Sequence, residues 1–158
     1  MPAPKTYLES SVISYLAARP SRDIVATAHQ QLTREWWEQR RHHFDLYVSI
    51  EVLNEIRRGD ADAARNRLSF IESIPVLEVD VQARSLASEI LKTSALPMKA
   101  AADAMHIAIA TVNGMDFLLT WNCTHIANGI VQRVITRICR EIGYEPPTVV
   151  TPEELMEG

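Results

Sequence analysis

The sequence predicts an α/β protein in which helices cover a central, mainly parallel sheet. Short apolar segments typical of strands alternate along the 158-residue chain with segments that have helical periodicity. Such alternation favours right-handed crossovers between parallel strands. The chain has five glycines and no internal repeat or Gly/Ser-rich linker. We therefore expect a single domain over residues 1–158, with short connections.

Each expected strand is short and apolar and is followed by a turn or by a signal that starts a helix. KTYLE, at residues 5–9, comes first, and Ser10 or Ser11 can cap the helix after it. VLEV follows Pro75, and FLLTW follows an Asn-Gly turn. The expected strands are Lys5–Glu9, Leu46–Ser49, Val76–Val79, Phe117–Trp121 and Thr148–Val150.

Helical periodicity fills the segments between the strands. Asp80 is placed to cap one helix, whereas Gly59 and Gly143 end two others. The most apolar helix carries AAADAMHIAIA and is expected to be buried in the middle of the domain. We expect helices at about Val12–Ala18, Arg22–His43, Val52–Ile56, Asp60–Ile71, Asp80–Lys92, Lys99–Val112 and Asn128–Ile142.

Composition and charge narrow the class of protein. With 47% hydrophobic residues, no bilayer-spanning apolar run and no signal-peptide pattern, the chain is expected to be cytoplasmic, without a membrane segment. Cys123 and Cys139 form neither a CxxC pair nor a disulfide framework, so we expect reduced thiols. The net charge of −4 argues against a protein that coats nucleic acid. It is compatible with a nuclease, because divalent cations can neutralise an acidic pocket.

Asp103 gives the sharpest signal of chemistry in the sequence. A carboxylate in so apolar a helix must be paired or must bind a metal. Its alternative role is that of an acid in the first turn of a helix that begins slightly later. His106, one turn further on, is expected to be a hydrogen-bonded partner or a packing residue rather than a metal ligand.

Further oxygen donors lie at or just after the carboxyl ends of expected strands, where open parallel sheets bind their ligands. Glu9 ends the first strand, where a surface acid would also favour the helix dipole. Glu55 follows the second strand, and Glu51 competes with it from one turn earlier on the same edge of the helix. Asn122 offers an amide oxygen, which could instead bond the backbone in a turn. Trp121 could stack on a base or pack internally.

Carboxylate and amide oxygens suit Mg²⁺ or Mn²⁺ rather than zinc, which prefers His and Cys. Hydrolysis of a phosphodiester bond uses such a cation to generate a nucleophile and to shield charge. A Gly-rich phosphate loop, a GxSxG motif and an HExxH motif are all missing from the sequence. The P-loop, α/β-hydrolase and zincin classes are therefore excluded.

Four segments in this order and spacing, YLESSVISYL, VSIEVLNEIRRGD, AADAMHIAIA and FLLTWNCTHIAN, resemble the PIN domain, in particular the VapC-like toxins of toxin–antitoxin pairs. The resemblance covers nearly the whole chain. It implies a three-layer α/β/α sandwich, a Mg²⁺- or Mn²⁺-dependent endoribonuclease and a cognate antitoxin that blocks the site. It matches Glu55, Asp103 and Asn122 to the family's acidic or amide positions, and makes Thr120 and Ser10 neighbours of the ligands.

Glu9 departs from the family pattern, which normally has aspartate in a YLDTS-like motif where this chain has YLESS. Glutamate can still reach a metal, but with altered geometry and more rotamer freedom to lose. Because Mg²⁺ is strict about octahedral geometry, we expect weaker Mg²⁺ binding or relatively better use of Mn²⁺.

Two other functions stay open at this point. The first is a PIN-fold binding module whose chemistry has weakened and which acts through RNA or an antitoxin, as Glu9 and Asn122 would allow. The second is another parallel α/β protein, such as a phosphoacceptor domain or phosphohydrolase. Those proteins use an aspartate nucleophile and a lysine after a late strand, and no lysine follows Trp121.

Trp36 and Trp37 point about 100° apart on the predicted long helix, so both cannot easily pack inside. At least one is expected at an interface or partly exposed, on a surface for an antitoxin or for the homodimer that the family resemblance suggests.

Overall fold

The computed structural model describes residues 2–93 and 96–157. Within these residues, the strands form one sheet of five. They are β1 (Lys5–Leu8), β2 (Asp45–Ser49), β3 (Val76–Leu77), β4 (Phe117–Leu119) and β5 (Thr148–Val150). Every strand pair is parallel, in the order β3-β2-β1-β4-β5. This topology confirms the predicted parallel sheet.

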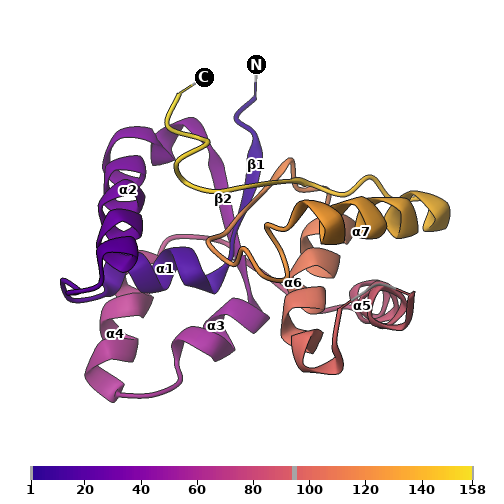
Figure 1. The fold of residues 1–158 in the computed structure, drawn as a ribbon, viewed down its shortest axis with the longest axis horizontal. Helices are drawn as coiled ribbons and strands as arrows, with labels where there is room; N and C mark the ends of the chain where they lie inside the picture. Colours follow the sequence, from indigo (N-terminus) through magenta and orange to yellow (C-terminus); the bar gives the residue numbers. More distant parts are fainter. Residues whose placement is uncertain (1, 94–95, 158) are drawn as a thin grey trace.

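The helices of the described residues agree with the prediction in type and order. They are α1 (Ser10–Ala17), α2 (Ile24–Arg40), η1 (Arg41–His43), α3 (Ile50–Ile56), α4 (Ala61–Phe70), α5 (Val81–Thr93), η2 (Met98–Ala100), α6 (Ala101–Val112) and α7 (Gly129–Ile142). Figure 1 shows α1, α2 and α4 on one side of the sheet and α5, α6 and α7 on the other. This is the predicted α/β/α sandwich. None of these helices is both long and apolar enough to cross a bilayer.

Strand β1 lies at the centre of the sheet, where Thr6 pairs with Leu46 of β2 on one side and Phe117 of β4 on the other. The chain builds one half of the sheet outward through β2 and β3, and the other half through β4 and β5. The strand order therefore reverses between β1 and β4. Open α/β sheets bind ligands at such a reversal, beyond the carboxyl ends of the strands. Glu9 and Thr120, which directly follow these two strands, are placed there.

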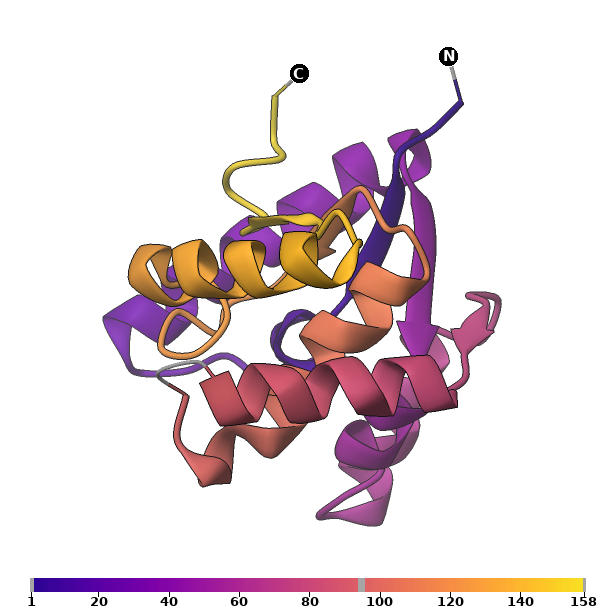
Figure 2. The ribbon, with the colours of Figure 1, turned by 90° about the vertical axis from the view of Figure 1, so that its right-hand side faces the viewer.

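The central strands are buried on both faces, as is usual for parallel sheets covered by helices. Tyr7 and Leu8 of β1 and Leu118 and Leu119 of β4 have no exposed surface. Helix α6 follows the same rule, with all residues from 106 to 111 buried. Helix α5 packs against both α6 and α7 (Figure 2). It covers the apolar helix α6 on the side away from the sheet.

The structure also decides two questions that the sequence left open, the start of α6 and the environments of Trp36 and Trp37. Helix α6 begins at Ala101, after the 3₁₀ turn η2, so Asp103 lies in its first turn as the alternative interpretation required.

Trp36 is completely buried, whereas Trp37 is partly exposed and packs edge-on against Phe70 and beneath the Arg41 guanidinium. This confirms that the two tryptophans do not share one environment.

Candidate metal centre

Glu9 connects β1 to α1 and is held in place by hydroxyl groups. Its carboxylate is buried, with 5% of the residue exposed. Oε2 accepts a hydrogen bond from Ser10 Oγ (2.9 Å), and Oε1 accepts from Thr120 Oγ1 (2.7 Å) and from Ser11 Oγ. Hydrogen bonds to a charged acceptor offset much of the cost of burying it. The carboxylate is therefore fixed at the end of β1, in an orientation that depends on α1 and β4.

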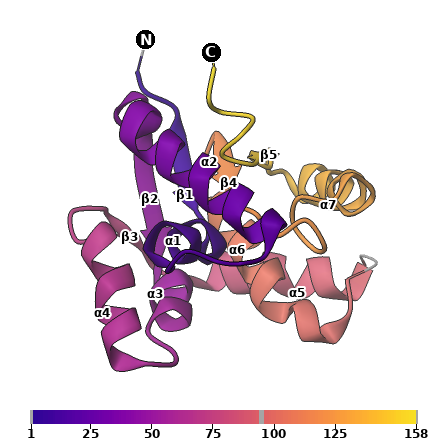
Figure 3. The ribbon, with the colours of Figure 1, turned by 60° about the vertical axis from the view of Figure 1, so that its left-hand side comes forward.

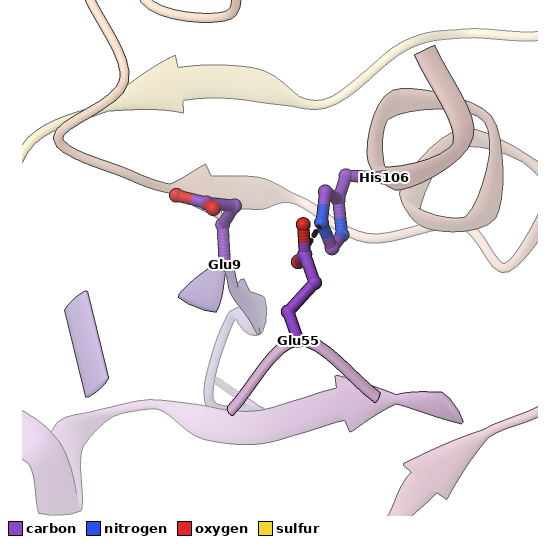
Figure 4. Close-up of side chains that lie close together, drawn as sticks. All are labelled: Glu9, Glu55 and His106. Carbon is purple, nitrogen blue, oxygen red and sulfur yellow. Dashed lines mark hydrogen bonds and ion pairs between the residues drawn. The ribbon is translucent and has the colours of Figure 1, made fainter. Parts of the chain in front are cut away.

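Glu55 reaches the same place from α3, which Ser49 caps at the end of β2. Its Oε1 accepts from Ser10 Oγ (2.6 Å) and from Nε2 of His106 (2.5 Å). The close-up in Figure 4 shows the Glu55 carboxylate directed at the His106 ring, with Glu9 beside them. The hydroxyl of Ser10 thus lies between the two carboxylates.

His106 comes from α6 and has no exposed surface. Its second ring nitrogen, Nδ1, lies 2.6 Å from the hydroxyl of Tyr7, which is also 2.7 Å from Ser49 Oγ. Both ring nitrogens are therefore occupied by partners, as expected for a hydrogen-bonded histidine rather than a metal ligand. The ring therefore connects Glu55 of α3 to Tyr7 of β1.

Each of His106 and Glu55 favours the charged form of the other. Burial of the ring favours its neutral form and is the strongest single influence. The hydrogen bond and charge of Glu55, with the charges of Glu9 and Glu51, outweigh it and raise the pKa of His106. For Glu55, burial alone would raise the pKa, but His106, Ser10 and Arg58 together lower it. Glu55 is therefore ionised over the physiological range.

The ligand atoms of Glu9, Glu55 and His106 all lie within 4.8 Å of one another. Because His106 already has two partners, the carboxylates are the atoms available to a cation. Each ionised carboxylate has about four lone-pair sites, so hydrogen bonds from serine and threonine leave capacity for a metal. Hard oxygen donors of this kind fit Mg²⁺ or Mn²⁺.

Asp103 and Asn122 form a second cluster next to the first. Oδ1 of Asp103 accepts from Asn122 Nδ2 (3.0 Å), and Oδ2 accepts from His125 Nδ1 (2.9 Å). The amide oxygen of Asn122 accepts the backbone N–H groups of Thr124 and His125, the turn-forming role that the sequence left as an alternative. In this structure Asp103 lies outside the group formed by Glu9, Glu55 and His106.

Thr120 connects the two clusters. Its hydroxyl donates to Glu9 and accepts the backbone N–H of Asn122 at 2.9 Å. A chain of hydrogen-bonding contacts therefore links, in order, Glu55, Ser10, Glu9, Thr120, Asn122, Asp103 and His125. The four predicted acid and amide positions and their two predicted neighbours all belong to this chain.

Three residues contact the site without being predicted as part of it. Tyr7 lies within an expected strand, and Ser11 is expected from the sequence only as a helix cap. His125 follows Asn122 by three residues, and the turn centred on Asn122 brings its ring back to Asp103. The signal for His125 was the Asn-Cys-Thr-His spacing, because an asparagine commonly bonds backbone N–H groups two and three residues later.

Trp121, beside the site, is a packing residue in this structure. Only 9% of it is exposed, and its indole N–H donates to Thr33 Oγ1 at 2.7 Å. Its ring stacks on His29 at a centroid distance of 3.9 Å, and Tyr15 contacts it edge-on. The indole face is therefore covered by protein rather than available to a base.

The sequence of the chain matches a known family, and its fold is similar to the folds of known proteins. The model of the PIN domain matches residues 6–122. Among solved structures, VapBC2 from Rickettsia felis, bound to a promoter DNA fragment, is similar with a TM-score of 0.60 and 11% identity, covering 93% of this chain and 98% of that one. VapC20 from Mycobacterium tuberculosis, a toxin that cleaves the sarcin-ricin loop, is similar with a TM-score of 0.61 and 19% identity, covering 79% and 95%. No curated protein has a significantly similar sequence.

Proposed function

The chain belongs to the PIN domain family, and on that basis we propose that it is a Mg²⁺- or Mn²⁺-dependent endoribonuclease, the toxin of a toxin–antitoxin pair. The observation that carries this proposal is the hydrogen-bonded chain of carboxylates at the strand-order reversal, with Glu9 and Glu55 in contact with a shared hydroxyl. The similarity in fold to VapC20, a toxin that cleaves the sarcin-ricin loop, supports the choice of substrate class.

In this proposal Glu9, Glu55 and Asp103 hold the cation, with Asn122 as a neutral donor. The bound cation would supply charge neutralisation at the scissile phosphate and activation of water. The protein's own groups have separate tasks. Ser10, Ser11 and Thr120 orient Glu9, and His106 orients Glu55. Both carboxylates are therefore held in place before a metal binds.

The partners proposed for the chain follow from the same reasoning. A cognate antitoxin would cover the acidic site, and the similarity in fold to VapBC2 and to the toxin VapC20 supports such a partner. We also propose a cytoplasmic location and a homodimer, in which two such sites would line one groove. The partly exposed Trp37 provides an apolar contact for either partner.

Cleavage of RNA tests the proposed activity directly. The antitoxin-free protein is incubated with a structured RNA and with Mn²⁺ or Mg²⁺, beside Asp103→Ala and a chelator control. We expect fragments from the natural protein only, with loss of roughly 100-fold or more in rate for the variant and complete loss with chelator. A rate close to that of the natural protein in either control would contradict a carboxylate-held metal.

A binding module with weakened chemistry is the second candidate. It is favoured by the position of Asp103 outside the first cluster and by the use of the Asn122 oxygen in a turn. RNA binding with a measurable Kd, but no cleavage in either metal, would support this candidate over the nuclease.

Glu9→Asp tests whether the longer side chain tunes the metal preference. Aspartate cannot reach the three hydroxyl groups that hold Glu9 without a shift, but it restores the shorter ligand of the family pattern. We expect the affinity for Mg²⁺ relative to Mn²⁺ to rise by roughly three- to tenfold, equivalent to about 1 kcal/mol. Isothermal titration with each metal measures this ratio, and an unchanged ratio would show that Glu9 does not coordinate.

A further inference from the structure

Arg58 lies at the end of α3, just beyond Glu55. The helical turn continues past Ile56, because the Arg57 N–H donates to Leu53 O and the Arg58 N–H donates to Glu55 O at 3.3 Å. Residues three apart lie on the same side of a helical turn. Arg58 is therefore on the side of α3 that presents Glu55 to the carboxylate cluster.

The guanidinium of Arg58 is available for binding. Among the described residues it forms no hydrogen bond and no ion pair, and the residue is exposed. Two other exposed arginines are engaged, since Arg140 pairs with Glu145 and Arg65 pairs with Asp62. The charge of Arg58 nevertheless acts on Glu55 and contributes to lowering its pKa. Arg58 thus lies close enough to the site to influence it, yet it has no partner of its own.

The backbone that carries Arg58 is held firmly by α4, which Figure 3 shows beside α3. Arg67 of α4 donates from Nε to Ile56 O at 2.8 Å and from Nη2 to Arg58 O at 2.7 Å. One guanidinium thereby fixes the turn in two places. A side chain on a fixed turn loses less freedom when it binds a ligand than one on a loose loop.

The charge balance explains what Arg58 would bind. Glu9, Glu51 and Glu55 together give this edge of the sheet a negative field, and the whole chain carries −4. A cation held by the carboxylates neutralises only the innermost part of that field. A phosphodiester group beside the cleaved one would still be repelled, unless a positive side chain lies at the edge of the cluster. A guanidinium can bind phosphate oxygens with two parallel hydrogen bonds.

We infer that Arg58 binds a phosphate of the RNA strand next to the one that is cleaved, and so positions the substrate over the carboxylate cluster. This inference rests on the proposed ribonuclease function. It assigns to Arg58 a positioning role, distinct from that of the metal-holding residues, and makes Arg67 the residue that keeps Arg58 in place.

Arg57 provides a matched control. It is the preceding residue, also exposed and also without a hydrogen bond or ion pair of its side chain among the described residues. It points about 100° away around the helix. We would compare the natural protein with Arg58→Ala, Arg58→Lys and Arg57→Ala. Each is assayed for cleavage of a single-stranded RNA, and each is then placed in an Asp103→Asn background for measurement of Kd at several salt concentrations.

Arg58→Ala is expected to raise KM and Kd by roughly tenfold with little change in kcat, whereas Arg57→Ala changes either constant by less than about twofold. The slope of log Kd against log salt should fall by about 0.7 for Arg58→Ala, the loss of one phosphate contact on a single strand, and should recover in Arg58→Lys. A merely structural role would leave that slope unchanged.

The outcomes separate the two proposals. If the natural protein cleaves RNA but the two alanine variants behave alike, the inference about Arg58 is overturned and the proposed function stands. If the natural protein neither cleaves nor binds RNA, the proposed function fails and the inference fails with it. An effect of Arg58→Ala on kcat alone, with KM and the salt slope unchanged, also overturns the positioning role.

Discussion

Glu55→Gln is expected to reduce the rate of RNA cleavage by roughly 100-fold or more while the protein stays folded. Glutamine has nearly the same shape, and its amide oxygen can still accept from Ser10 and His106. The negative charge is lost, however, and with it the attraction for a divalent cation. Initial rates at saturating Mn²⁺, with circular dichroism spectra of both proteins, measure the two parts of this expectation.

Glu51→Gln is the control for this substitution. Glu51 lies on the same helix and affects the pKa of His106 only through its charge, without a hydrogen bond to it. We expect its removal to change the rate by less than about threefold, as for a remote charge in solvent. Equal losses in the two variants would mean that general negative charge, rather than coordination by Glu55, supports activity.

His106→Ala is expected to lower the free energy of unfolding by about 3 kcal/mol. The ring has no exposed surface, so its removal opens a cavity. It also leaves the Tyr7 hydroxyl and the Glu55 carboxylate without their shared partner. Urea denaturation in the presence of a chelator measures the loss, and His125→Ala, in a half-buried position, should cost less than about 1 kcal/mol.

The same variant should change how stability depends on pH. A raised pKa means that the folded state binds the proton of His106 more tightly, so the stabilisation is complete below the ordinary value of 6.5 and is lost as pH rises through the raised pKa. The metal-free natural protein should therefore lose stability as pH rises above the ordinary value of 6.5 and through the raised pKa of His106. A natural protein whose stability does not fall as pH rises, or a variant with the same slope, would show that His106 and Glu55 do not carry the charges assigned to them.

The order of the elements was predictable because it depends on local patterns. Gly59 and Gly143 follow the ends of helices, and Pro75 directly precedes a strand. The start of α6 was predicted two residues early, because the 3₁₀ turn at Met98–Ala100 continues the same apolar composition. Composition does not distinguish a 3₁₀ turn from the first turn of an α-helix.

The sequence predicts that the oxygen donors of the site lie near one another at the strand ends, but it does not predict how they are grouped. Glu9, Asp103 and Asn122 lie at strand ends or helix starts, which the sequence reveals. Whether Asp103 contacts Glu9 or Asn122 depends instead on how far α6 lies from β1, and that distance is set by the packing of buried side chains. The shared role of Ser10 depends on the same packing, since it requires α1 and α3 to approach each other within a hydrogen bond.

Ser10 has a consequence for the energetics of the two carboxylates that it contacts. Its hydroxyl lies 2.9 Å from an oxygen of Glu9 and 2.6 Å from an oxygen of Glu55, yet it carries a single proton. At any instant one of the two carboxylates is without that donor, so the site is frustrated: two acceptors compete for one hydrogen. A cation between the carboxylates would satisfy both at once and free the hydroxyl to rotate. Metal binding would then relieve a local conflict built into the fold, in addition to neutralising charge.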